Sequence, residues 1–127
     1  MGVLAPCLPY IDLLFANQEE ARLLTACEDD AACATALQDK GVGTVVIKQG
    51  AAGCAVFTPG NHLRVPGFPV EAIDSTGAGD CFAGGFLAGL YYGAPLEGAA
   101  KLANAAGALS VSRLATFWRK IRFFDVR

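Results

Sequence analysis

The segment Ile73–Phe82 reads IDSTGAGDCF and brings two acids, two hydroxyl side chains and two glycines together in ten residues. A run of small and apolar residues follows, in which Phe82, Phe86 and Leu90 recur at helical spacing. This pattern predicts a glycine-rich turn that feeds a helix over residues 77–92. The start of a helix presents unpaired backbone N–H groups and the positive end of the helix dipole. The segment is therefore predicted to bind an anion.

The predicted anion hole consists of Gly77, Ala78 and Gly79. The segment has neither the G-x-x-x-x-G-K-[ST] pattern nor the third glycine of G-x-G-x-x-G, which excludes the two commonest nucleotide-binding motifs. Asp80 falls in the first helical turn, where the dipole favours the ionised form and makes it a weak base. Phosphoryl transfer accepts a weak base because the proton of the nucleophile leaves late. Asp80 either serves a hydroxyl substrate in this way or stabilises the helix N-terminus.

The rest of the chain alternates between strand and helix patterns, so we expect an α/β fold. Gly84, Gly85 and Gly89 interrupt the helix at 77–92, and each costs roughly 1 kcal/mol relative to alanine. We therefore expect this helix to pack closely against a neighbour. The predicted strands are 11–16, 44–48, 54–57, 62–65 and 68–73, and the other predicted helices are 18–25, 29–40 and 95–113.

Composition indicates a single globular domain, because 54% of the 127 residues are hydrophobic and the mean hydropathy is +0.40. There is no uncharged apolar run of membrane-spanning length and no basic segment before an apolar start, so we expect a cytoplasmic protein without a membrane partner. The five cysteines include no C-x-x-C pair and the chain has one histidine. This favours free, buried thiols over disulfides or a zinc site.

The last thirteen residues, 115–127, read ATFWRKIRFFDVR and interleave aromatic and basic side chains. The body is acidic, whereas residues 113–127 carry five basic and one acidic side chain. Such a mixture can bind nucleic acid or a membrane surface. A terminal segment that docks its aromatic rings on the body is the favoured interpretation, so we expect no nucleic-acid partner.

Four segments in this order resemble the ribokinase-like (PfkB-type) carbohydrate kinase family. The segment Asp74–Asp80, followed by Phe82, resembles the family signature D-[ST]-x-G-A-G-D and an aromatic residue. The other three are Asn17-Gln18-Glu19-Glu20, which resembles the N-x-x-E motif; Lys48-Gln49-Gly50 with Gly53, which resembles the strand and turn that face the nucleotide phosphates; and residues 103–108, which resemble the helix near the adenine. The resemblance implies a three-layer α/β/α (Rossmann-like) sheet with helices on both faces.

The resemblance implies a kinase that transfers the γ-phosphate of ATP to a sugar hydroxyl. Asp80 would be the base, and Gly77, Ala78 and Gly79 would stabilise the transferring phosphoryl group. The implied nucleotide contacts are Lys48, Gly50, Gly53, Thr76 and Asn104; the implied Mg²⁺ site, largely through water, is Asn17 with Glu20; and Asp74 would belong to a loop that binds a monovalent cation such as K⁺.

Each of these residues also has an ordinary structural interpretation. Asn17 could cap a helix and Glu20 could lie on a solvated helix face. The two glycines could serve a hairpin turn, and Lys48 could form a surface ion pair. Asn104 could hydrogen-bond the backbone, and Asp74 could hydrogen-bond its own turn.

The resemblance runs from about residue 11 to residue 113 and corresponds to the C-terminal part of a typical member. We therefore expect residues 1–114 to be the nucleotide-binding part of a kinase domain truncated at its N-terminal side, with 115–127 as an atypical tail. Most sugar contacts lie in the other part, so the sugar is not identified. An uncovered sheet edge would favour a homodimer or pairing with a chain that supplies this part. The alternative function is a nucleotide-binding module without turnover of its own.

Overall fold

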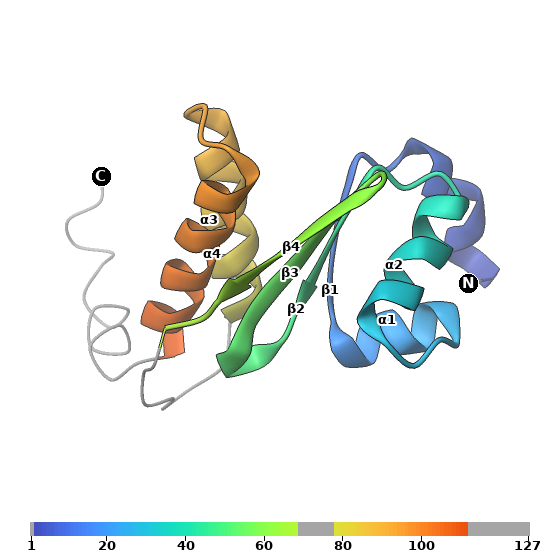
Figure 1. Cartoon of the computed structure of the whole chain (residues 1–127), viewed down its shortest axis with the longest axis horizontal. Helices are drawn as coiled ribbons and strands as arrows, with labels where there is room; N and C mark the ends of the chain where they lie inside the picture. Colours follow the sequence, from blue (N-terminus) through green and yellow to red (C-terminus); the bar gives the residue numbers. More distant parts are fainter. Residues whose placement is uncertain (1, 69–77, 112–127) are drawn as a thin grey trace. The chain divides into compact units, whose positions relative to one another are not determined.

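The computed structural model describes residues 2–68 and 78–111. The chain forms two compact units, Met1–Val65 and Pro66–Arg127 (Figure 1). Several features predicted above lie outside the described residues, namely nearly all of strand 68–73, the residues Asp74, Thr76 and Gly77, and the tail 115–127. Among the described helices, none has the length and apolar character needed to cross a membrane.

The first unit is built on a mixed sheet in which four strands lie in the order of the sequence. The parallel pair β1–β2 starts at the register Leu13↔Thr44, and β2 runs antiparallel to β3. The β-branched run at 44–48 forms its strand as predicted. The strands are β1 (Leu13–Asn17), β2 (Thr44–Lys48), β3 (Gly53–Thr58) and β4 (Asn61–Pro66).

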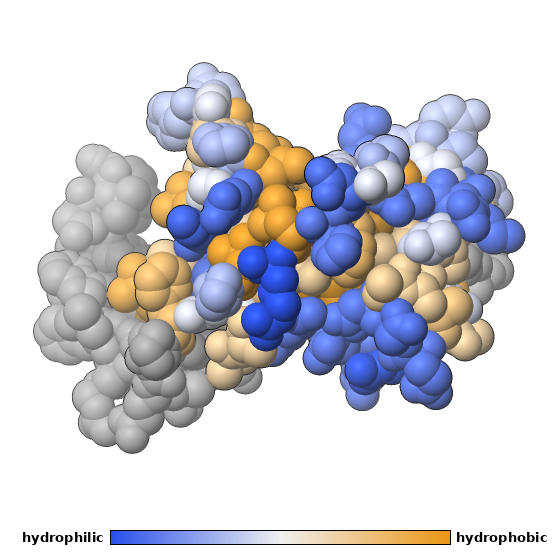
Figure 2. Space-filling model, viewed as in Figure 1, coloured by the Kyte–Doolittle hydropathy of each residue, from blue (hydrophilic) through white to orange (hydrophobic). Residues whose placement is uncertain are grey.

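Two helices, α1 (Gln18–Thr25) and α2 (Asp30–Asp39), make the crossover from β1 to β2 and confirm the helices predicted there. Their inner faces bury Ala21 and Leu37 against Val45 and Ile47 of β2. Fully burying a leucine, valine or isoleucine side chain stabilises the fold by about 1.5–3 kcal/mol. In Figure 2 the visible surface of this unit mixes hydrophilic and weakly hydrophobic residues, and Leu23 of α1 is 78% exposed.

A 3-10 segment, Gly2–Tyr10, precedes the sheet and was not predicted, because its two prolines hide any helical period. Its Leu8 is 1% exposed and belongs to the core. Gly41, with φ +109°, lies against this segment, and a Cβ atom there would be 2.6 Å from the Cα of Pro9. Glycine at this position therefore permits both the backbone conformation and the close approach.

The second unit contains the helices α3 (Ala78–Tyr91) and α4 (Leu96–Val111), which pack against each other. A Cβ atom on Gly89 would be 2.8 Å from the Cα of Ala99, and one on Gly85 would be 3.0 Å from the carbonyl oxygen of Leu102. The predicted close packing is confirmed at these two glycines. It is wrong for Gly84, where an added Cβ atom would meet nothing of a neighbouring element within 4 Å in the described part of the chain.

All five cysteines are free thiols. Cys33 and Cys54 are buried as predicted, and Cys27 is half-buried. The prediction is wrong for Cys7 and Cys81, which are exposed. Cys81 lies one residue before the buried Phe82 in α3, on a different side of the helix.

Candidate functional site

The predicted Mg²⁺ and phosphate residues of the first unit lie at the carboxyl ends of the parallel strands. Asn17 and Lys48 are register partners in the last positions of the parallel strands β1 and β2. In open α/β sheets, ligands bind outside the carboxyl ends of parallel strands. The structure therefore brings these two predicted residues together at the edge where a ligand is expected.

Asn17 and Glu20 form a reciprocal capping box at the start of α1. The Asn17 side-chain Oδ1 accepts from the Glu20 backbone N–H at 2.7 Å, and the Glu20 Oε1 accepts from the Asn17 N–H at 2.9 Å. The structural interpretation of Asn17 as a cap is thus correct, and Glu20 takes part in the same cap. Both side chains are exposed.

The donor set around this cap suits a hydrated magnesium ion. Mg²⁺ keeps several of its waters and is commonly held through one or two carboxylates. The capping bond occupies one carboxylate oxygen of Glu20. Within residues 2–68 and 78–111, no three acidic, histidine or cysteine side chains cluster into a cage for a metal. Binding largely through water therefore remains the prediction.

The glycine turn after β2 is a short 3-10 segment, Gly50–Ala52, closed by a 2.8 Å bond from the Gln49 N–H to the Gly53 carbonyl oxygen. Gly50 has φ +61° and Gly53 has φ +108°, so both positions favour glycine. The turn role of these glycines is therefore correct. A Cβ atom on Gly50 would meet no described atom within 4 Å, which leaves room for a ligand to approach the backbone.

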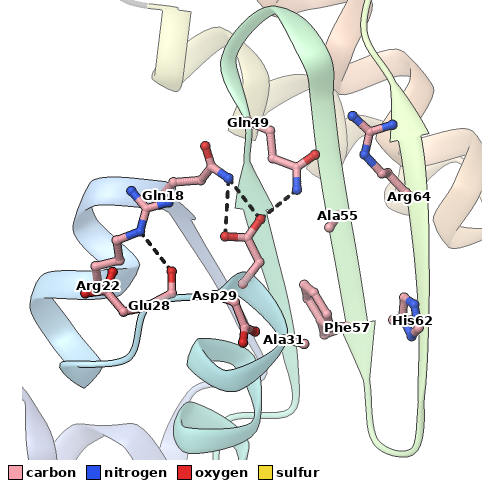
Figure 3. A pocket seen from close by; sticks show the side chains of 11 residues that line it. Gln18, Arg22, Glu28, Asp29, Ala31, Gln49, Ala55, Phe57, His62 and Arg64 are labelled. Carbon is pink, nitrogen blue, oxygen red and sulfur yellow. Dashed lines mark hydrogen bonds between the residues drawn. The ribbon is translucent and has the colours of Figure 1, made fainter.

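A hydrogen-bond network that sequence reasoning missed involves the residues that follow Asn17 and Lys48. The Asp30 carboxylate, in the first turn of α2, accepts from the side-chain amides of both Gln18 and Gln49 (Figure 3). The Gln49 bond is 2.7 Å long. Asp30 reads in the sequence only as an acid at a helix start. No sequence signal indicates its partners, which lie 12 and 19 residues away.

The network borders a pocket of about 540 Å³ in the first unit, lined by residues of α1, the α1–α2 loop, α2, β3 and β4 (Figure 3). Phe57 and His62 stack in its wall with ring centroids 5.8 Å apart. Arg22 donates from Nε to the Glu28 carbonyl oxygen at 3.0 Å. None of the residues predicted for the site lines this pocket. Two of its lining residues, Gln18 and Gln49, are nevertheless sequence neighbours of the predicted residues Asn17 and Lys48.

The second unit carries the predicted catalytic residues. Asp80 lies in the first turn of α3, as predicted, and Ala78 and Gly79 are the first two residues of that helix. Asp80 and Gly79 are exposed. Asn104 of α4 is 7% exposed and donates from Nδ2 to the Pro66 carbonyl oxygen at 3.1 Å. The backbone bond foreseen for Asn104 is therefore present.

Comparison with known proteins gives the family. A family model described as pfkB family carbohydrate kinase matches residues 1–117. A ribokinase from Haemophilus influenzae is 39% identical over 111 residues, which make up 84% of this chain and 36% of the relative. A cytidine kinase from Thermococcus kodakarensis is 40% identical over 95 residues, which make up 72% of this chain and 34% of the relative. The chain thus spans about a third of the length of these curated relatives.

Comparison with solved structures points to the same family. A solved structure described as a ribokinase II from E. coli, in complex with ATP and Mg²⁺, superposes with a TM-score of 0.81 at 31% identity. The superposition covers 89% of this chain and 37% of that one. The predicted ribokinase-like α/β fold class is confirmed. The sequence match and the structural match agree, and the chain belongs to the pfkB family of carbohydrate kinases.

Proposed function

We propose that the chain supplies the nucleotide-binding and catalytic residues of an ATP-dependent carbohydrate kinase, which transfers the γ-phosphate of ATP to a sugar hydroxyl. Membership of the pfkB family is the observation that carries this proposal. Residues 1–114 form the kinase part and residues 115–127 an atypical tail. The pairing of Asn17 with Lys48 at the carboxyl ends of β1 and β2 supports the proposal, because it brings together residues suited to binding Mg²⁺ and phosphate.

In the proposed reaction, Asp80 accepts the proton of the attacking hydroxyl. Asp80 lies exposed in the first turn of α3, and a carboxylate is a weak base. A weak base suffices because the proton leaves late in a loose transition state. The backbone N–H groups of Gly77, Ala78 and Gly79 stabilise negative charge on the transferring phosphoryl group.

The residues of the chain fit ATP and Mg²⁺ as cofactors. Bound ATP supplies the phosphoryl group, and Mg²⁺ neutralises charge on its phosphates. The oxygen atoms of Asn17 and Glu20 are of the kind that Mg²⁺ prefers, directly or through water. The proposed nucleotide contacts are Lys48, Gly50, Gly53 and Thr76 near the phosphates and Asn104 near the adenine, and Asp74 is proposed for a monovalent cation such as K⁺.

β1 is one of the two outer strands of the described sheet, and no described strand pairs with its other side. We propose that this edge pairs with a second copy of the chain or with a chain that carries the sugar-binding residues of the family. We also propose that the protein is located in the cytoplasm.

Asp80→Asn tests the catalytic role. We expect sugar-dependent release of ADP, measured over a panel containing ribose, fructose, inositol and cytidine, to fall by about 10²–10⁴-fold. Glu97→Gln is the matched control, because Glu97 is also an acid in the first turn of a helix in this unit and forms an ion pair with exposed Lys101 at 3.6 Å. The control should keep the activity of the unmodified chain.

Equal rates for Asp80→Asn and the unmodified chain would remove Asp80 as the base. Binding of ATP without turnover of any acceptor would instead support the alternative, a nucleotide-binding module that needs another chain for catalysis. Isothermal titration calorimetry with ATP and Mg²⁺ separates these two outcomes.

A further inference from the structure

One carboxylate connects the two segments of the first unit that are proposed to face ATP and Mg²⁺. Gln18 donates from Nε2 to both carboxylate oxygens of Asp30, at 3.3 Å and 3.1 Å. Gln49 donates from its own Nε2 to the Asp30 Oδ2 at 2.7 Å. Figure 3 shows the two glutamine amides converging from α1 and from the end of β2. Asp30 thus joins the start of α1 to the turn after β2.

Each glutamine lies next to proposed site residues. Gln18 follows Asn17 directly, and Gln49 stands between Lys48 and Gly50. We propose that Asp30 is a positioning residue, which fixes the Mg²⁺-binding start of α1 relative to the phosphate-binding turn by holding Gln18 and Gln49. This inference rests on the proposed function. It adds a residue to which the family motifs give no role.

The network is better suited to fixing a geometry than to stabilising the fold. The Oε1 atom of Gln49 is buried and, within the described part of the chain, accepts no hydrogen bond. A buried acceptor without a donor costs free energy that an apolar side chain of similar shape would avoid. Asp30 would stabilise the start of α2 through the helix dipole even without these partners. The amide–carboxylate bonds therefore add a fixed distance between two segments.

The test compares two glutamines whose amides have different partners. Gln49→Met removes the bond to Asp30 together with the unsatisfied acceptor. Gln38→Met is the control, because the Gln38 amide donates to the backbone oxygens of Gly43 and Phe57 and touches neither proposed segment. Thermal unfolding and the dissociation constant for the ATP analogue AMP-PNP with Mg²⁺ are measured for both variants.

We expect Gln49→Met to unfold within about two degrees of the unmodified chain and to bind Mg²⁺·AMP-PNP roughly tenfold more weakly. Gln38→Met should unfold at a clearly lower temperature and keep the original dissociation constant. Asp30→Asn should weaken binding as Gln49→Met does. Asp29→Asn, which removes the same charge from the same helix end while retaining a capping oxygen, should not.

A second measurement decides the inference without any nucleotide. In ¹H–¹⁵N spectra, Gln49→Met should shift the backbone amide signals of Asn17 and Glu20, and Gln38→Met should leave them in place. Unchanged Asn17 and Glu20 signals in Gln49→Met would overturn the positioning role, whatever the chain binds. Shifted signals in a chain that binds no Mg²⁺·AMP-PNP would overturn the proposed function and, with it, the role given to Asp30.

Discussion

Asn17 and Lys48 are register partners at the carboxyl ends of β1 and β2, although 31 positions separate them along the chain. The parallel pairing of these strands is what makes the two residues neighbours. One of them caps α1, and the other immediately precedes the turn at 49–53. A helix and a glycine turn therefore begin next to each other at the carboxyl ends of these two strands.

Asn17→Ala should lower both stability and nucleotide affinity. Loss of this N-cap is expected to reduce the free energy of unfolding by about 0.5–2 kcal/mol, measured by urea denaturation. Asp29→Ala removes the N-cap of α2, whose side chain accepts from the Ala32 N–H at 2.7 Å, and should cost a similar amount. Only Asn17→Ala should also weaken Mg²⁺-dependent binding of ATP. Equal binding by both variants would leave Asn17 with its capping role alone.

Gly50→Ala should distinguish the effect of this glycine on stability from its effect on ATP affinity. The backbone at φ +61° costs alanine about 1–2 kcal/mol, and no described atom obstructs the added methyl group. Gly60→Ala is the matched control, because Gly60 has φ +76° and equally open surroundings in the β3–β4 turn. Both variants should lose similar stability. If phosphates approach Gly50, only its variant should lose affinity for ATP, and unchanged affinity would contradict this contact.

Two glycines of α3, Gly84 and Gly89, should respond to alanine with stability changes of opposite sign. Gly84→Ala places a methyl group in open space, so we expect a gain of about 0.5–1 kcal/mol from helix propensity. Gly89→Ala places the same group 2.8 Å from the Cα of Ala99, so we expect a loss of about 1–3 kcal/mol from overpacking. Thermal unfolding followed by circular dichroism measures both. A loss in both variants would show that the two positions are equally crowded.

The sequence predicts the first unit well wherever local patterns dominate. The β-branched run 44–48 predicts one strand and residues 29–40 predict one helix, and both predictions lie within a residue of the observed bounds of β2 and α2. The Asp30 network could not be predicted, because its bonds depend on which strands are neighbours. The segment 2–10 has no apolar period to identify it.

The error at Gly84 follows from helix geometry. Gly85 and Gly89 are four residues apart and therefore share the face that contacts α4, whereas Gly84 points about 100° away from Gly85. The number of glycines in the helix indicates that the helix packs closely against a neighbour. The four-residue spacing of Gly85 and Gly89 is what identifies the two glycines on the contact face. For Asn104 the sequence predicts a hydrogen bond to the backbone but cannot identify the acceptor, the Pro66 carbonyl oxygen, which lies 38 positions away.

The contact of Gly85 and Gly89 with α4 has a mechanical meaning for the second unit. Because the two backbones approach this closely at Gly85 and Gly89, little adaptable side chain separates the helices there, and we expect α3 and α4 to move as one rigid body. Asp80 lies near one end of α3, and Asn104 lies on α4. A movement of α3 that brings Asp80 closer to a hydroxyl group would then also move Asn104 on α4. The proposed base and the proposed adenine contact would therefore change position together.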